Sequence, residues 1–367
     1  MEWREQWPAL GRNHGRYVVH ESHLCRMYNT RFRVSKPALF FIFSLCLMAR
    51  PTAAQTAPAV YHNLVFEGGG VRGIAYVGAL RVLQERGVLA DIQRVGGTSV
   101  GAITALLLAL NYTPDEMETV LTSLNMGQFN DGQWLFVGGL ARTSRRYGWY
   151  RGERFNRWLE TLVARKTGNP NLTFAQLHNW RTNHVGTCDL YVTGTNLTAQ
   201  QSVVFSHEHT PDMPLKTAVR ISMSVPLYFG AVFLDETNQP VQRPKRGKSY
   251  QIFVDGGLTA NYPIALFDTN GVMNRQTLGL KLERPEQLRP GQAAGVIAPY
   301  TIHNLTDYVS AFYNYALENL NRHPALETGR TVYISTEGIT PRVRRMTDEQ
   351  RNSLINSGKR GVMLFFQ

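Results

Sequence analysis

The chain is poor in cysteine and lacks long hydrophobic runs. Its 367 residues include three cysteines, and 43% of the residues are hydrophobic while 18% are charged. The apolar run Ala38–Ala49 is too short to cross a bilayer as a helix. The sequence contains no low-complexity tract and no repeat of fixed period, which excludes fibrous and solenoid architectures. The composition is that of a globular protein with a sizeable core, built as one large domain or two smaller ones.

Signals for nucleic-acid binding are also missing. The formal net charge is +12, of which residues 55–367 carry +7. A moderately basic surface suits an anionic membrane or a nucleic acid, and charge alone does not choose between them. Because zinc-finger spacings, RNA-recognition motifs and basic heptads are absent from the sequence, we expect no nucleic-acid partner.

The N-terminal region has the pattern of a secretory signal peptide. Basic residues over 31–36 precede the apolar run Ala38–Ala49, and small residues lead to a cleavage site after Ala54. We therefore predict export to the periplasm or out of the cell. The leader has an ordinary length if the chain begins at Met27, and an apolar segment of the fold is the alternative interpretation. Cleavage would leave Cys188 as the one cysteine, without a partner for an internal disulfide.

Strand and helix patterns alternate along the rest of the chain. Short apolar runs predict strands, whereas apolar positions three and four apart and capping residues predict helices. The expected strands lie within residues 63–67, 87–97, 189–197, 202–206, 250–257, 277–282 and 331–335, and helices are expected over 74–86, after Gly101, and after Thr113, Thr173 and Thr347. Such alternation predicts a layered α/β sheet. A further helix over 302–320 is interpreted as docking on the fold, with a membrane-surface helix as the alternative.

A glycine-rich loop follows the first expected strand. In LVFEGGGVRGIAYVGAL (residues 64–80), the glycines Gly68, Gly70 and Gly73 have the spacing G-x-G-x-x-G of a dinucleotide site. A Rossmann site needs an acidic residue at the end of the second strand, whereas Asp91 precedes that strand. The nucleotide interpretation therefore fails, and the backbone amides of the loop are candidates for an oxyanion hole.

The second expected strand ends in a nucleophile elbow. Gly97-Thr98-Ser99-Val100-Gly101 has the spacing G-x-S-x-G, in which a sharp strand-to-helix turn exposes a serine hydroxyl at the helix N-terminus. The flanking glycines leave room for that turn, and the helix dipole lies beside the nucleophile. Parallel neighbouring strands would bring this turn and the glycine loop to one edge of the sheet.

A third glycine-containing turn supplies a candidate base. In FVDGGLTANYP (residues 253–263), Asp255 ends an expected strand and is followed by Gly256 and Gly257. Asp-Gly-Gly is also a common structural turn, so this motif gains its weight from the other two.

The three motifs, in this order, resemble the signatures of the patatin-like phospholipase family. A fourth block, AVRISMSVPLYF (residues 218–229), is similar to a further segment of the family, with Ser224 and Pro226 in place. The resemblance covers about residues 61–268. It implies an α/β fold of three layers, α/β/α, with a mainly parallel central sheet. It also implies a catalytic domain over residues 55–268, after an N-terminal extension with a signal peptide over 1–54, and a C-terminal α/β segment over 269–367 packed on the same domain.

The resemblance also implies the chemistry. Ser99 would be the nucleophile and Asp255 its general base, a dyad that hydrolyses carboxylic esters through an acyl-enzyme without metal or other cofactor. The oxyanion hole would come from the loop residues Gly68, Gly69, Gly70, Val71, Arg72 and Gly73, with Gly97, Gly101, Gly256 and Gly257 supporting the turns. The implied substrates are phospholipids or acylglycerols in membranes or micelles. A phosphate-facing role and a structural role both stay open for Arg72.

Two other functions compete with this interpretation. An α/β-hydrolase triad of Ser99, Asp255 and either His303 or His323 fits the chain order. Against it, Glu67 stands where the esterase form of the glycine loop has a histidine, and neither histidine follows an expected strand. A catalytically silent lipid-binding module on the same fold is the second alternative.

Further segments carry weaker signals. His207 and His209 have no metal-ligand partners at useful spacing, so we expect surface residues and no metal site. The basic stretches 141–158 and 242–249 fit solvated faces or contact with anionic lipid. The apolar stretch 133–140 is interpreted as core, with a membrane-inserting loop as the alternative.

Overall fold

The computed structural model describes most of the chain after residue 59. The described residues are 60–124, 126–131, 146–241, 247–288, 301–303, 324–340 and 346–367, together with residues 308, 311 and 315. All of them belong to the second of two units, Pro58–Gln367. The expected signal peptide and extension (1–54), the apolar stretch 133–140, parts of both basic stretches, His323 and most of the helix expected over 302–320 lie outside the described residues.

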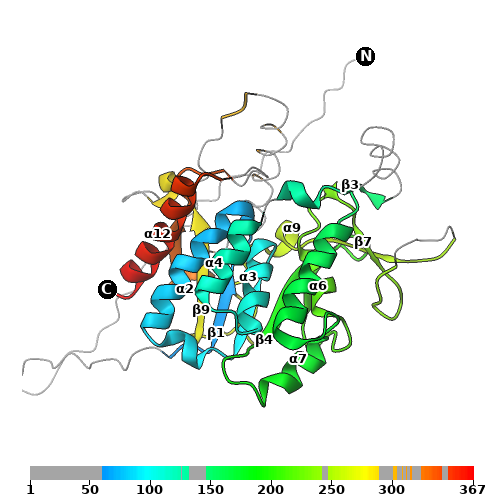
Figure 1. Ribbon diagram of the computed structural model, residues 1–367, viewed down its shortest axis with the longest axis horizontal. Helices are drawn as coiled ribbons and strands as arrows, with labels where there is room; N and C mark the ends of the chain where they lie inside the picture. Colours follow the sequence, from blue (N-terminus) through cyan, green and yellow to red (C-terminus); the bar gives the residue numbers. More distant parts are fainter. Residues whose placement is uncertain are drawn as a thin grey trace, which may run out of the picture. The chain divides into compact units, whose positions relative to one another are not determined.

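A mainly parallel sheet forms the centre of this unit (Figure 1). Its strands are β1 (Asn63–Phe66), β2 (Arg94–Gly97), β4 (Asp189–Asn196), β5 (Gln201–Phe205), β7 (Val232–Leu234), β8 (Gln251–Asp255), β9 (Thr277–Glu283) and β10 (Thr331–Ser335). The order is β10-β9-β1-β2-β4-β8-β7, with β5 also paired to β4. The pairs from β10 to β4 are parallel, and β8 runs antiparallel to both β4 and β7. A separate pair joins β3 (Gly148–Tyr150) to β6 (Leu227–Phe229).

The long strand β4 brings β2 and β8 together. Along one edge, its residues 192–196 pair with β5. Along the other edge, residues 189–192 pair with β2 and residues 194–196 with the antiparallel β8. Gly97 at the C-terminal end of β2 pairs with Val192, and Asp255 at the C-terminal end of β8 pairs with Gly194. The two strand ends therefore meet, separated along β4 by one residue.

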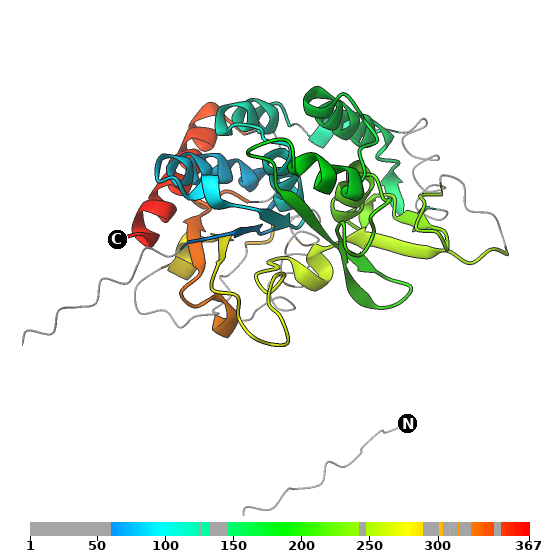
Figure 2. The same ribbon diagram turned by 90° about the horizontal axis from the view of Figure 1, so that it is seen from below.

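Helices cover the sheet. They are α2 (Ala75–Glu85), α3 (Val100–Ala109), α4 (Pro114–Ser123), α6 (Glu153–Thr167), α7 (Phe174–Arg181), α8 (Leu215–Ser222), α9 (Gly257–Ala260), α11 (Pro324–Glu327) and α12 (Asp348–Phe365), with short 3-10 turns η1 (Gly70–Ile74), η2 (Val88–Asp91), η3 (Met126–Phe129) and η4 (Pro285–Leu288). The long helices lie on one face of the sheet and the short α9 on the other, which gives the three layers (Figure 2). Within the described part of the chain, no helix is long and apolar enough to cross a bilayer.

Local sequence accounts for the main elements. Every residue of α3 is buried, as its unbroken apolar composition predicts. The capping boxes at Thr113, Thr173 and Thr347 are confirmed, because each threonine side chain accepts a hydrogen bond from the backbone three residues on. Six of the seven expected strands are confirmed within two residues at each end, and the expected range 87–97 contains β2 at its C-terminal end. The three-residue strands β3, β6 and β7 were not predicted, since so short a run shows no period.

Candidate active site

Ser99 lies in a strained turn between β2 and α3. Its backbone angles are φ 55° and ψ −123°, which a residue other than glycine seldom adopts. The Ser99 amide donates a hydrogen bond to Ser222 Oγ at 2.9 Å, which holds the turn from the end of α8. A β-carbon at Gly101 would lie 2.4 Å from the carbonyl oxygen of Phe66. The G-x-S-x-G segment therefore forms a sharp strand-to-helix turn, and its second glycine allows α3 to begin against β1.

Asp255 ends β8 in a buried position next to this turn. Its Oδ1 accepts a hydrogen bond from the Gly257 amide at 2.7 Å. Its own amide donates to the Ser224 carbonyl at 3.0 Å, and its carbonyl accepts from Thr195 Oγ1 at 2.9 Å. Both the backbone and one carboxylate oxygen are thus fixed. The other oxygen, Oδ2, is buried and makes no hydrogen bond of standard geometry with the described residues.

Burial dominates the electrostatics of Asp255. Loss of solvent raises the pKa of its carboxyl group to about 7, opposed by the Gly257 amide and by the nearby Ser99 hydroxyl. The Ser99 Oγ itself donates to Met223 Sδ at 3.4 Å, a weak acceptor. The serine hydroxyl therefore lies close to a carboxylate that ionises near neutral pH, without a strong competing bond.

The glycine loop lies beside Ser99. A β-carbon at Gly68 would lie 3.3 Å from Ser99 Cβ, so the loop runs directly beside Ser99. The Gly68 amide donates to the Asn261 carbonyl at 3.0 Å and is occupied. The amides of Gly69, Gly70 and Val71 have no acceptor among the described residues. Of the predicted oxyanion donors, the three after Gly68 are thus available to a ligand.

Arg72 holds the loop from within. Both its backbone amide, at 3.3 Å, and its side-chain Nε, at 3.0 Å, donate to the Gly69 carbonyl. Gly73 lies against α3, where a β-carbon would come within 2.5 Å of Val100 Cγ2. These contacts give Arg72 a structural role in shaping the turn.

The predicted residues come together, and four further ones join them. Ser222 and Met223 contact Ser99, and Glu67 and Asn261 bind the glycine loop. Ser222 and Met223 lie in the block 218–229 that resembled the family, and Asn261 lies six residues after Asp255. Their motifs were visible in the sequence, but nothing in it indicated which side chains point to the site. No histidine hydrogen-bonds to Ser99 or Asp255 within the described part of the chain.

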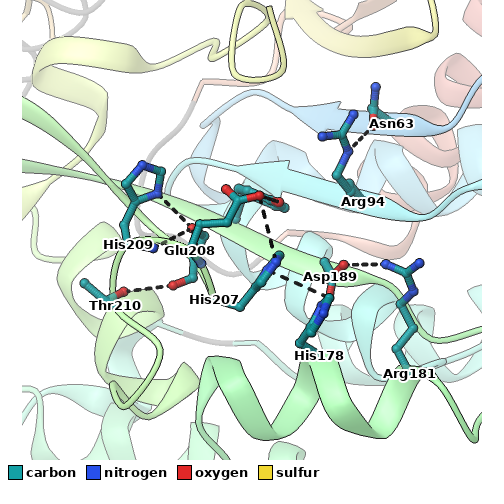
Figure 3. A network of polar contacts seen from close by, with 11 residues as sticks. Asn63, Arg94, His178, Arg181, Asp189, His207, Glu208, His209 and Thr210 are labelled. Carbon is teal, nitrogen blue, oxygen red and sulfur yellow. Dashed lines mark hydrogen bonds and ion pairs between the residues drawn. The ribbon is translucent and has the colours of Figure 1, made fainter. Parts of the chain in front are cut away.

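Three potential metal ligands meet at the N-terminal end of β4, near Asp189 (Figure 3). This end, called the far end below, is the one away from Ser99. His178, Asp189 and His207 offer ligand atoms within 4.8 Å of one another. The Asp189 carboxylate is already engaged, because Arg181 pairs with Oδ2 and His178 Nδ1 lies 2.9 Å from Oδ1. The two imidazoles are stacked at 4.1 Å with an interplanar angle of 9°. Since a metal lies in the plane of each imidazole that binds it, two parallel planes share no such position, and the present geometry is that of a polar cluster.

This cluster corrects one expectation. His209 is exposed as predicted, but His207 is largely covered, with a side-chain exposure of 20%, and its Nδ1 is buried. Its neighbours are His178 of α7 and Asp189 of β4. These residues are distant from His207 in the sequence, and their spacing therefore gives no sign of the cluster.

Comparison with known proteins agrees with the geometry. Residues 64–268 match the family model described as patatin-like phospholipase. The chain is 27% identical over 320 residues to the uncharacterised protein YqhO of Bacillus subtilis, covering 84% of this chain and 99% of that protein. It is 26% identical over 231 residues to a probable lipid hydrolase of Invertebrate iridescent virus 6, covering 61% and 69%.

A solved structure shares the fold. The crystal structure of VipD from Legionella pneumophila superposes with a TM-score of 0.57 at 19% identity, covering 84% of this chain and 67% of that one. The family model spans more than half of the chain and includes the elbow, the glycine loop and Asp255. The chain belongs to the patatin-like phospholipase family.

Proposed function

We propose that the protein is a lipid acyl hydrolase that cleaves carboxylic esters through an acyl-enzyme on Ser99. The family assignment supports a lipid hydrolase in general terms. One observation supports the Ser–Asp mechanism in particular. A buried aspartate with one uncommitted oxygen lies next to a serine held in a strained turn. Neither feature contributes to stability, and together they form a nucleophile with its base.

The first chemical step uses both residues of the dyad. The Ser99 hydroxyl turns from Met223 to Asp255 and gives its proton to Oδ2 as Oγ attacks the ester carbonyl carbon. The carbonyl oxygen becomes an oxyanion, which the available amides of Gly69 and Gly70 bind. Asp255 then returns the proton to the leaving alkoxide as the carbon–oxygen bond breaks. The acyl group stays on Ser99.

The second step repeats the same proton transfers with water. Asp255 takes a proton from a water molecule that attacks the acyl-enzyme, and then protonates Ser99 Oγ as the fatty acid leaves. A base whose pKa is about 7 suits this cycle, because at neutral pH it both accepts and releases the proton.

The proposed substrate is a phospholipid or acylglycerol in a membrane or micelle, of the phospholipase A or lysophospholipase type. The basic charge of residues 55–367 supports binding to an anionic surface. We further propose that the protein acts after export, in the periplasm or outside the cell, and that residues 1–54 are removed. N-terminal sequencing of the protein recovered from its host tests that cleavage.

The decisive experiment compares the purified wild type with Ser99→Ala and Asp255→Ala. Each receives a fluorogenic short-chain ester and mixed anionic liposomes, with and without EDTA, and each is treated with a fluorophosphonate probe. We expect the wild type to be labelled and to release fatty acid in EDTA, and both variants to lose hydrolysis while remaining folded. A folded wild type that neither labels nor hydrolyses, even after addition of cell lysate, would favour a lipid-binding module.

A further inference from the structure

The direction of the Gly69 amide depends on Asn261. Asn261 makes two hydrogen bonds to Gly68, the residue before Gly69. Its carbonyl accepts from the Gly68 amide at 3.0 Å, and its Nδ2 donates to the Gly68 carbonyl at 3.2 Å. The Gly68 carbonyl and the Gly69 amide belong to one planar trans peptide, in which C=O and N–H point in opposite directions. By holding the carbonyl, Asn261 therefore aims the Gly69 N–H away from itself.

Glu67 in turn holds the Asn261 side chain. The Glu67 Oε1 accepts from Asn261 Nδ2 at 3.2 Å, and Oε2 accepts from the Leu282 amide of β9 at 2.7 Å. The Glu67 carbonyl accepts a third bond, from the Tyr76 hydroxyl at 2.7 Å. The carboxyl group is buried and lies directly before the glycine run. It links the glycine loop to β9, the neighbour of β1, and to Asn261 at the C-terminal end of α9.

We propose that Glu67 and Asn261 are positioning residues for the oxyanion hole, which fix the Gly69 amide for catalysis. This inference rests on the proposed function, since it assigns a task within the same site. Neither side chain contacts the reacting atoms in this arrangement. Both act through the Gly68–Gly69 peptide.

The arrangement of donors requires an acid at position 67. Both carboxylate oxygens accept hydrogen bonds, whereas the amide of a glutamine has one acceptor and one donor. In Glu67→Gln, the side-chain NH2 group takes the place of one carboxylate oxygen. It must then face either Asn261 Nδ2 or the Leu282 amide, and both of these are donors. Asn261 cannot relieve this by turning its amide over, because Oδ1 would then face the Gly68 carbonyl oxygen.

Charged neighbours act on Glu67 in both directions. The pKa of its carboxyl group is raised to about 8, chiefly because burial disfavours the charged form; Glu283 also raises this pKa, whereas Lys281, the Leu282 amide and Arg72 lower it. Tyr76 and Tyr262 are the other titratable groups that interact with it, and burial holds the pKa of both phenols well above its ordinary value. The ionised form receives both hydrogen bonds, so the loop should be best ordered once Glu67 has lost its proton.

The test compares four proteins: wild type, Glu67→Gln, Asn261→Asp and the double variant. In the double variant, the new amide at position 67 donates to the new carboxylate at position 261 and its oxygen accepts from the Leu282 amide, so these bonds are restored. The bond to the Gly68 carbonyl is not, because a carboxylate cannot donate to it. We therefore expect the double variant to regain part of the thermal stability that the single variants lose, but not kcat.

Kinetics on a soluble ester give the readout. At pH 9, where Glu67 is ionised, we expect kcat of each single variant to fall by about 10- to 100-fold, less than the loss of a whole oxyanion donor, with KM within about threefold. The rise of kcat/KM with pH near 8 should disappear in Glu67→Gln. Glu327→Gln is the matched control, because it replaces another buried glutamate that binds Lys281 but does not contact the loop, and its kcat should stay at the wild-type value.

The outcomes separate this inference from the proposed function. A wild type without esterase activity contradicts the proposed function. An active wild type with Glu67→Gln and Glu327→Gln at equal kcat contradicts only the positioning role. Recovery of both stability and kcat in the double variant would also overturn it, since the Gly68 bond would then be dispensable.

Discussion

Two buried aspartates lie at opposite ends of β4, and they differ in the hydrogen bonds of their carboxylate oxygens. Asp189, at its first residue, has both carboxylate oxygens engaged, one by Arg181 and one by His178. Asp255, opposite Gly194 near its last residue, has one oxygen without a hydrogen bond among the described residues. Satisfied carboxylates add to stability, whereas an unsatisfied buried one lowers it. This difference supports the proposal that Asp255, and not Asp189, takes part in proton transfer.

The largest expected effect comes from replacing each aspartate by asparagine. Asp255→Asn removes the proposed base and keeps the shape of the side chain, so kcat for ester hydrolysis should fall by about 100- to 10,000-fold. Asp189→Asn breaks the pair with Arg181, so the free energy of unfolding should fall by about 1–3 kcal/mol with kcat unchanged. Steady-state kinetics and urea unfolding measure the two effects.

Each aspartate is the control for the other. If Asp189→Asn lost activity while remaining folded, the two ends of β4 would be coupled and the contrast between them would fail. If Asp255→Asn kept more than a tenth of the wild-type kcat, another group would have to be the base.

The end of β4 next to Ser99 and Asp255 was more predictable from the sequence than the end at Asp189. Ser99, Asp255 and the glycine loop each occupy a short motif at the end of a strand, and such motifs are readable because the turn itself requires glycine. The antiparallel direction of β8 was not readable, although it is what brings Asp255 to face the end of β2. Glu67 and Asn261 bind each other across 194 residues, and His207 lies near Asp189 because β5 pairs with β4. Contacts of this kind depend on tertiary structure and leave no local pattern.

The pH dependence of stability sharpens the same contrast. Burial raises the Asp255 pKa from 3.8 to about 7, so the folded protein holds this proton more tightly than the unfolded chain. Stability from this group is therefore present below pH 4 and is lost as the pH rises to 7. Asp255→Asn has no such proton. Its free energy of unfolding relative to that of the wild type should therefore increase between pH 4 and pH 7, by at most about 4 kcal/mol. Urea unfolding at pH 5 and pH 7.5 compares them, and a constant difference would contradict the buried, raised pKa.

The smallest effects are expected from the histidines of the far cluster. His178→Ala removes the hydrogen bond to Asp189 and should cost about 1–2 kcal/mol of unfolding free energy. His207→Ala should cost less, because its Nδ1 lies 4.0 Å from Asp189 and makes no hydrogen bond with the described residues. Thermal unfolding with and without Zn²⁺ measures both. We expect zinc to shift the melting temperature of wild type and His207→Ala equally, because the stacked rings do not share a metal position. A zinc-dependent stabilisation that His207→Ala abolishes would show instead that one imidazole ring turns and that this end of β4 binds a metal ion.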